Sequence, residues 1–168
     1  MSANLDLAPI GNCAVSALVD KQARFVWACV PRVDGDPAFS ALLSDADAAA
    51  PETSGVWAID VENSVETTQS YERNTAILRT KVRDKNGGVL EIIDFCPRFR
   101  RNNRVYRPLA FTRILKPTAG APRIRMRLTP TADWGARVAD RTFGSNHIRF
   151  LTAGAALRLT TTGPVSLI

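Results

Sequence analysis

The chain has 168 residues, of which 45% are hydrophobic and 23% charged. These values are typical of a single globular domain and exclude a disordered segment. No apolar run is long enough to span a bilayer, and the start of the chain lacks a basic segment followed by an apolar stretch. We therefore expect a cytoplasmic location. The formal net charge of +6 is compatible with an anionic partner, with a basic face toward an acidic domain, or with a genomic preference for arginine.

The cysteine and histidine content argues against both disulfides and a metal centre. Cys13, Cys29 and Cys96 are odd in number and far apart, which fits neither disulfide pairs nor a zinc site. We expect them to be small apolar core residues. The only histidine, His147, excludes a His-rich metal site, and no glycine-rich phosphate loop is present. The sequence therefore predicts no metal and no cofactor.

Alternation of apolar and polar residues predicts strands along most of the chain. Residues 123–128 alternate strictly, with Ile124, Met126 and Leu128 on one face. Residues 75–96 are expected to form a β-hairpin, because Asn86-Gly87 favours the positive φ angles of a tight turn. Further strands are expected at 12–19, 24–30, 55–61, 65–72, 109–116, 146–152 and 156–162.

Helical spacing of apolar residues occurs only around Phe39, Leu42 and Leu43, which predicts one short helix over 37–48, followed by a loop to residue 53. Many short strands separated by turn signals predict an all-β fold, an antiparallel β-sandwich formed by one domain over residues 1–168. The sequence given stops on apolar residues at 165–168. We interpret this as a boundary before a further domain.

No complete catalytic constellation is found. A Gly-x-Ser-x-Gly elbow is absent from the sequence, and His147 lies in an expected strand, which favours a structural role. Glycosidic cleavage needs a pair of carboxyl groups that flank the sugar. Asp34, Asp36, Asp94 and Asp133 are the candidates, but aspartate more often serves to form turns. We therefore predict no catalytic residue in this chain.

A basic segment follows the predicted hairpin. Between Pro97 and Arg107, two aromatic residues accompany five arginines: Arg98, Arg100, Arg101, Arg104 and Arg107. Arginines could bind phosphates while Phe99 and Tyr106 stack on bases. Alternatively, the segment is a long solvated loop whose arginines meet acidic residues of a neighbouring domain. We favour this second interpretation, because the paired aromatic motifs of an RNA-binding sheet are absent.

The stretch from Trp27 to Phe39 is the most distinctive in the chain. A strand is expected to end at Pro31, before Arg32 and Asp34. The guanidinium fork of Arg32 and the carboxylate of Asp34 suit sugar hydroxyls, and Trp27 could stack on a sugar ring. The alternative is that Trp27 belongs to the core and that Arg32 and Asp34 form a local ion pair.

Several stretches resemble, in collinear order, the opening of the glucoamylase- and trehalase-like glycoside hydrolases of family fifteen. They are Ile10–Asp20, Trp27–Asp34, Phe39–Leu43, Gln69–Thr80, Asp94–Pro97 and Pro130–Gly135. Departures from the family pattern occur at Ala23, Val26, Val33, Thr131 and Ala132. These departures affect the expected shape of the substrate rim more than the alternating core pattern.

The resemblance implies a supersandwich-type β domain followed by an (α/α)₆ barrel that holds two catalytic glutamates for inverting hydrolysis. That barrel is not part of this sequence, so we expect the chain alone to be inactive. The implied partners are the barrel of the same protein and a glucoside at the rim, to which Trp27, Arg32 and Asp34 would contribute. Self-association of the isolated domain would follow from its exposed barrel-facing surface.

Two rival hypotheses remain at this stage. The first is a stand-alone carbohydrate- or RNA-binding β module built on the segment from Arg98 to Arg107. The second is a small hydrolase that uses Asp34 with Asp94 or Asp133. Neither involves a membrane.

Overall fold

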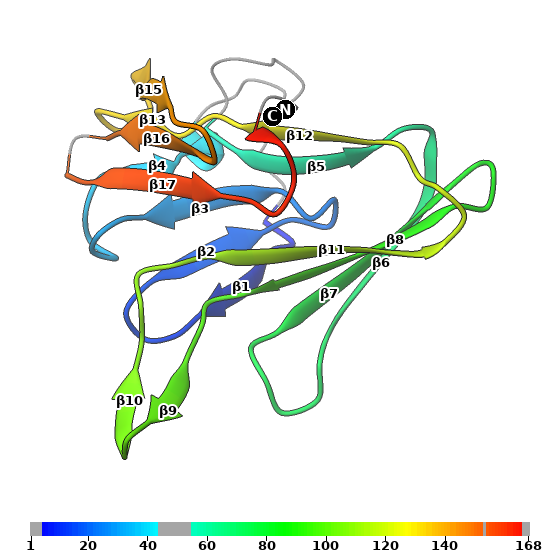
Figure 1. The fold of residues 1–168 in the computed structure, drawn as a ribbon, viewed down its shortest axis with the longest axis horizontal. Coiled ribbons are helices and arrows are strands. Elements are labelled where there is room, and N and C mark those ends of the chain that lie inside the picture. Colours follow the sequence, from blue (N-terminus) through cyan, green and yellow to red (C-terminus); the bar gives the residue numbers. More distant parts are fainter. Residues whose placement is uncertain (1–4, 44–54, 153, 166–168) are drawn as a thin grey trace.

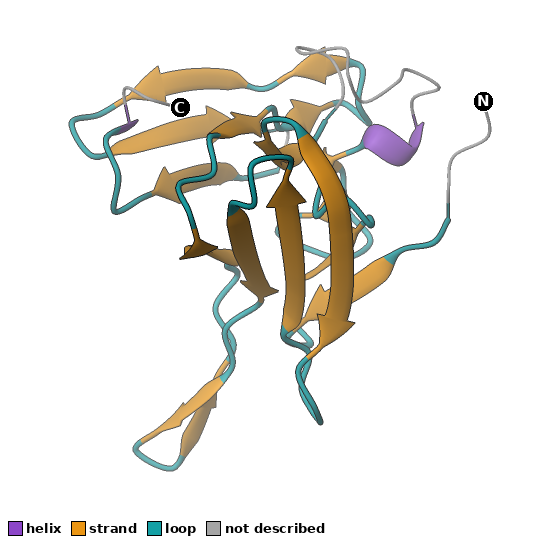
Figure 2. Ribbon diagram, turned by 90° about the vertical axis from the view of Figure 1, so that its right-hand side faces the viewer, coloured by secondary structure: helices purple, strands orange, loops and turns teal. Residues whose placement is uncertain are grey.

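Antiparallel strands make up almost all regular structure in residues 5–43, 55–152 and 154–165, the part of the chain that the computed structural model describes (Figures 1 and 2). The largest sheet has the strand order β1-β2-β3-β5-β12, with β4 paired to β3. Its strands are β1 (Ala8–Gly11), β2 (Ser16–Val19), β3 (Phe25–Cys29), β4 (Pro37–Phe39), β5 (Trp57–Val61) and β12 (Ile124–Leu128).

Two further sheets complete the body of the domain. One has the order β11-β8-β7-β6 and the other the order β15-β16-β17. Their strands are β6 (Ser64–Tyr71), β7 (Leu78–Asp84), β8 (Val89–Phe95), β11 (Thr112–Ala119), β15 (Asp140–Phe143), β16 (His147–Leu151) and β17 (Ala156–Thr160). Two small hairpins form separate two-stranded sheets: β9 (Phe99–Arg101) with β10 (Arg104–Tyr106), and β13 (Thr131–Ala132) with β14 (Arg137–Val138).

The core lies between the six-stranded and four-stranded sheets, as expected of a sandwich. Ile59 and Val61 of β5 pack with Val82, Leu90 and Ile92 of β7 and β8. The alternation in β7 explains this arrangement, because its buried residues alternate with exposed ones and so face one side of the sheet. The all-β sandwich predicted from the sequence is confirmed.

Aromatic rings fill one end of this core and surround a buried ion pair. Phe25 contacts both Trp57 and Phe111 edge to face, with ring centroids 5.3 and 5.7 Å apart. The Arg113 guanidinium lies 4.5 Å from the centroid of the Phe25 ring and donates to Asp94 at 2.8 and 3.0 Å. Both side chains are almost fully buried. The pair is stable there because the two oxygens meet two guanidinium donors.

Most predicted strands are confirmed, and three expectations are wrong. No helix forms in residues 37–43: Pro37–Phe39 is a buried strand, and only a single 3₁₀ turn, η1, follows at Ala41–Leu43. Residues 44–53 lie outside the described part of the chain. The strand expected at 12–19 is confined to Ser16–Val19, after a turn. The basic segment is a hairpin, β9 and β10, and not an irregular loop.

Candidate functional site

The loop between β3 and β4 carries the predicted pair Arg32 and Asp34. The guanidinium Nε and Nη2 of Arg32 donate to the two carboxylate oxygens of Asp34, each at 2.8 Å. Both side chains are well exposed. The hydrogen bonds from Arg32 hold the pKa of Asp34 below its ordinary value. Asp34 is therefore an ionised acceptor at neutral pH, and the sequence-based expectation of a local ion pair is met.

A second loop is tied to this one by Asp36. Its carboxylate accepts hydrogen bonds from the backbone amides of Asp133 at 2.8 Å and of Trp134 at 2.7 Å. The turn after β13 is thereby joined to the β3–β4 loop, although the two are 97 and 98 residues apart in sequence. We call the surface formed by residues 32–36 and 133–137 the two-loop surface.

The two-loop surface combines an exposed aromatic ring with a second ion pair. Trp134 is 59% exposed. Nε of Arg137 donates to Asp133 at 2.6 Å, and this contact raises the pKa of Arg137 above its ordinary value. A flat apolar ring next to fixed donors and acceptors is an arrangement suited to polyhydroxylated ligands.

Buried contacts support the two-loop surface from below. The Ser40 and Thr131 hydroxyls lie 2.7 Å apart and are hydrogen-bonded. Gly135 packs closely on Ser40, since a Cβ atom at this glycine would lie 2.9 Å from the serine Oγ. The backbone of Gly135 has a φ of +87°, which favours glycine. The turn that presents Trp134 is therefore fixed in place by β4 and β13.

Trp27 lies elsewhere. It is half-buried in β3 and is paired with Leu18 of β2 in the sheet register. Within the described residues, no hydrogen bond or ring contact joins Trp27 to Arg32 or Asp34. Sequence reasoning considered Asp36 only as a candidate catalytic carboxylate, and it missed Trp134 and Arg137. Asp133 and Gly135 are turn-forming residue types, so the sequence could place Trp134 in a turn but not show that its ring is exposed.

The buried position of Asp94 bears on the hydrolase hypothesis. Its side chain is fully buried and bound to Arg113, so no substrate can reach it. Asp133 is exposed and held by Arg137. A carboxylate pair that includes Asp94 is therefore ruled out as a means of glycosidic cleavage.

The basic hairpin projects from the body of the domain at the lower left of Figures 1 and 2. We call residues 98–107 the arginine arm. Its turn is formed by Asn102 and Asn103, whose φ angles of +49° and +58° match a two-residue hairpin turn. All ten residues of the arm are exposed, which places the five predicted arginines on its surface.

A single buried amide holds the base of the arm. Nδ2 of Asn12 donates to the carbonyl oxygens of Pro97 at 2.8 Å and Pro108 at 2.9 Å, the residues that flank the arm. Its Oδ1 accepts from the amides of Ala14 and Val15. Asn12 therefore fixes both ends of the arm to the turn between β1 and β2.

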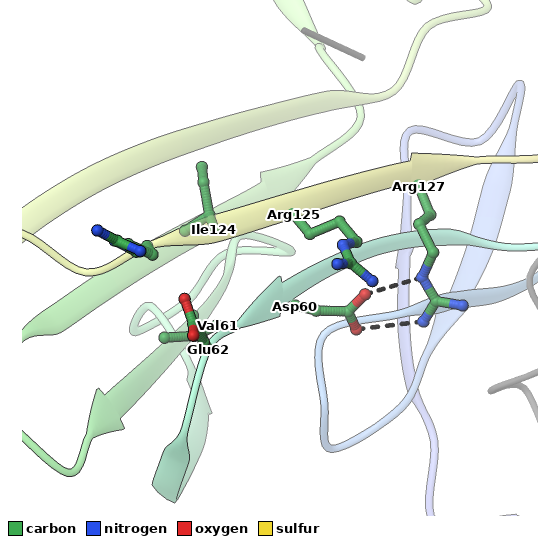
Figure 3. A pocket seen from close by; sticks show the side chains of 7 residues that line it. Asp60, Val61, Glu62, Ile124, Arg125 and Arg127 are labelled. Atoms are coloured by element: carbon green, nitrogen blue, oxygen red, sulfur yellow. Dashed lines mark hydrogen bonds and ion pairs between the residues drawn. The ribbon is translucent and has the colours of Figure 1, made fainter.

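A shallow pocket of about 700 Å³ lies on β5 and β12 (Figure 3). Arg127 donates to both oxygens of Asp60, at 2.8 and 3.2 Å, and Arg125 points toward the same carboxylate. Glu62 and Arg123 also line the pocket. Three arginines and two acidic residues line this pocket, and Asp60 is already bound to Arg127.

Other expected features are located as follows. His147 lies at the start of β16 with its Nδ1 3.0 Å from the Asn146 side-chain oxygen. In the described residues, no group of three histidine, cysteine or acidic side chains is arranged to hold a metal ion. Cys29 and Cys96 are buried as expected, whereas Cys13 is exposed, so the core position expected for it is wrong. The described residues contain no helix of the length and apolarity needed to cross a membrane.

Comparison with known proteins agrees with this architecture. A family described as "Trehalase-like, N-terminal" matches residues 6–165, nearly the whole chain. Searches among curated proteins and solved structures gave no match. The family assignment supports the role of a non-catalytic N-terminal domain of a glycoside hydrolase. On the basis of this match and the all-β fold, the chain belongs to the trehalase-like N-terminal domain family.

Proposed function

We propose that this chain is the N-terminal domain of a glucoamylase- or trehalase-like glycoside hydrolase of family fifteen, and that it packs on a downstream catalytic barrel. The family match over residues 6–165 carries this proposal. The burial of Asp94, which leaves it unable to meet a substrate, supports a domain without its own cleavage machinery. The reaction of the parent enzyme would be inverting hydrolysis of an α-glucosidic bond.

The role within the parent enzyme would be to shape the rim of the active site. The two-loop surface supports this role, because it presents Arg32, Asp34 and Trp134 on two loops joined by Asp36. Trp27, the aromatic residue expected at the rim from the sequence, is half-buried in β3 and is the weaker candidate. In this proposal Trp134 supplies the apolar contact to a glucoside, and the Arg32–Asp34 pair supplies hydrogen bonds.

Glucose release from trehalose and maltooligosaccharides tests the domain assignment. The chain alone is compared with the parent protein that includes the barrel. Release by the parent protein only is expected. Release by the chain alone would overturn the proposal, because the chain would then contain the cleavage machinery.

Variants of the parent protein test the rim separately. Trp134→Ala and Arg32→Gln are expected to raise KM by roughly tenfold with little change in kcat, as for contacts made equally in the ground and transition states. Arg158→Gln, an exposed change on β17, is the matched control. Unchanged KM in both rim variants would contradict the rim role and leave the domain assignment intact.

A further inference from the structure

The positive charge of the arginine arm is not neutralised within the domain. None of its five arginines forms an ion pair with another residue in the described part of the chain. Among the described residues, Arg98 alone of the five forms a side-chain hydrogen bond, a weak one of 3.7 Å to the Cys13 sulfur. Residues 97–110 contain no carboxylate. In the body, Arg24, Arg79 and Arg113 all meet carboxylates. The opposed Arg149 and Arg158 of β16 and β17 form no ion pair with a described residue, but no aromatic stack is found beside them.

Like charges face each other across the arm. The register places Arg101 of β9 directly opposite Arg104 of β10, next to the turn. Directly opposed like charges destabilise an antiparallel pair. An acidic group bound between the two guanidinium forks would remove this repulsion and form charge-assisted hydrogen bonds.

An exposed aromatic stack lies next to this arginine pair. Phe99 and Tyr106 are opposite each other in the register and stack with centroids 5.6 Å apart and ring planes at 13°. They remain 49% and 41% exposed. Residues directly opposite share one face of a hairpin, and so do residues two apart on one strand. The Phe99–Tyr106 stack and the Arg101–Arg104 pair are two residues apart on both strands, so they lie on the same face. A two-stranded hairpin without a covering layer is marginally stable in water, and a partner on this face would stabilise it.

We propose that the arginine arm is a docking arm for a carboxylate-rich protein surface. The Arg101–Arg104 pair binds acidic side chains through its guanidinium forks, and the Phe99–Tyr106 stack packs against apolar groups beside them. The anchor at Asn12 holds the arm out from the body, so that it reaches a surface that the sheets themselves do not contact.

The aromatic stack favours protein over nucleic acid as the partner. Single-stranded nucleic acid is bound by aromatic rings that each present a face to a successive base. Here each ring covers one face of the other, so the pair offers one compact apolar platform. The arm is also short, and only Arg101 and Arg104 lie beside its turn, whereas nucleic-acid binding uses an extended basic track. The proposal does not depend on the rim role of the two-loop surface, since it concerns different residues.

Binding of the chain to fluorescein-labelled poly-L-glutamate at low ionic strength, followed by fluorescence anisotropy, tests the proposal. Arg101→Gln with Arg104→Gln is expected to weaken binding by about tenfold. The matched control is Arg149→Gln with Arg158→Gln, which removes two directly opposed exposed arginines from β16 and β17. A change below about twofold is expected for the control. Equal weakening by both pairs would show binding to net charge alone and overturn the docking arm.

Three further measurements make the outcome decisive. Single-stranded and duplex DNA of matched charge are titrated under the same conditions; tighter binding of either one than of poly-L-glutamate overturns the assignment to a carboxylate-rich partner. Arg101→Lys with Arg104→Lys keeps the charge and the hairpin but removes the guanidinium forks, so intermediate affinity is expected. Amide hydrogen exchange in residues 99–106 of each variant verifies that the arm is folded. Wild-type affinity in a folded Arg101→Gln, Arg104→Gln variant would also refute the proposal.

Discussion

The carboxylate of Asp36 accepts a hydrogen bond of 2.7 Å from the backbone amide of Trp134, 98 residues further along the chain. A second bond, of 2.8 Å, comes from the amide of Asp133. Both amides belong to residues with positive φ angles, +56° and +57°. These angles are unfavourable for residues other than glycine, and the two hydrogen bonds to Asp36 offset that cost.

Asp36→Ala should therefore release the turn that presents Trp134. We expect the free energy of unfolding to fall by about 1–2 kcal/mol, and amide exchange at Trp134 to accelerate. Urea denaturation and hydrogen exchange measure the two effects. Asp36→Asn retains one acceptor oxygen, so its free energy of unfolding should fall by less than that of Asp36→Ala. Unchanged exchange at Trp134 in Asp36→Ala would mean that the turn is held by Ser40 and Gly135 alone.

Asp94→Asn tests the buried ion pair. The substitution leaves the Arg113 guanidinium without a counter-ion among the rings of Phe25 and Trp57. Removing one partner of a buried pair costs about 3–5 kcal/mol, and urea denaturation should reveal a loss of this size. Asp60→Asn, which breaks a partly exposed pair with Arg127, should cost less than about 1 kcal/mol. Equal losses of unfolding free energy in Asp94→Asn and Asp60→Asn would show that burial of the ion pair does not determine its contribution to stability.

Gly55→Ala and Gly87→Ala form a matched pair, because both glycines have positive φ angles, +52° and +84°. A Cβ atom at Gly55 would lie 2.7 Å from the backbone nitrogen of Ser40, whereas one at Gly87 would meet nothing within 4 Å. We expect Gly87→Ala to lower the free energy of unfolding by about 1 kcal/mol, because of backbone strain. Gly55→Ala should lower it clearly more, because backbone atoms must also move to make room for the methyl group. Thermal unfolding of both variants measures the difference. Similar melting temperatures would refute the steric argument.

The Cys96 thiol should make stability depend on alkaline pH. Burial, followed by the negative charge of Asp94, raises its pKa from 9.0 to about 12. As the pH rises, the thiol of the unfolded chain loses its proton before that of the folded chain. The contribution of the thiol to the free energy of unfolding is therefore complete below pH 9 and is lost between pH 9 and about 12. We expect a loss of about 1 kcal/mol per pH unit above 9, measured by urea denaturation. Cys96→Ala should reduce this loss, whereas exposed Cys13→Ala should not.

The regular parts of the fold could be predicted because their pattern is local. In β12 the alternation of Ile124, Met126 and Leu128 with arginines was sufficient, and the hairpin of β7 and β8 followed from Asn86-Gly87. The helix predicted over 37–48 failed for a non-local reason. Phe39 has helical spacing with its neighbours, but β4 is buried against β3, and the pairing of Phe39 with Ala28 determines its structure.

The site could be predicted only in part. The Arg32–Asp34 pair lies within one loop and was foreseen from the sequence. The joining of that loop to Trp134 depends on a contact across the domain that no local pattern reports. The arginine arm was missed as a hairpin because each of its strands is only three residues long, half of those residues are arginines, and its turn lacks glycine.

The anchor at Asn12 makes the length of the arginine arm independent of the rest of the domain. Pro97 and Pro108 are held by one side chain, so residues between them can be added or removed without displacing β8 or β11. Residue pairs inserted symmetrically would extend the reach of the arm and keep Phe99 opposite Tyr106. A single inserted residue would instead shift the register and separate the aromatic stack from the Arg101–Arg104 pair. The reach of the arm can therefore be changed in steps of two residues per strand without altering which residues share a face.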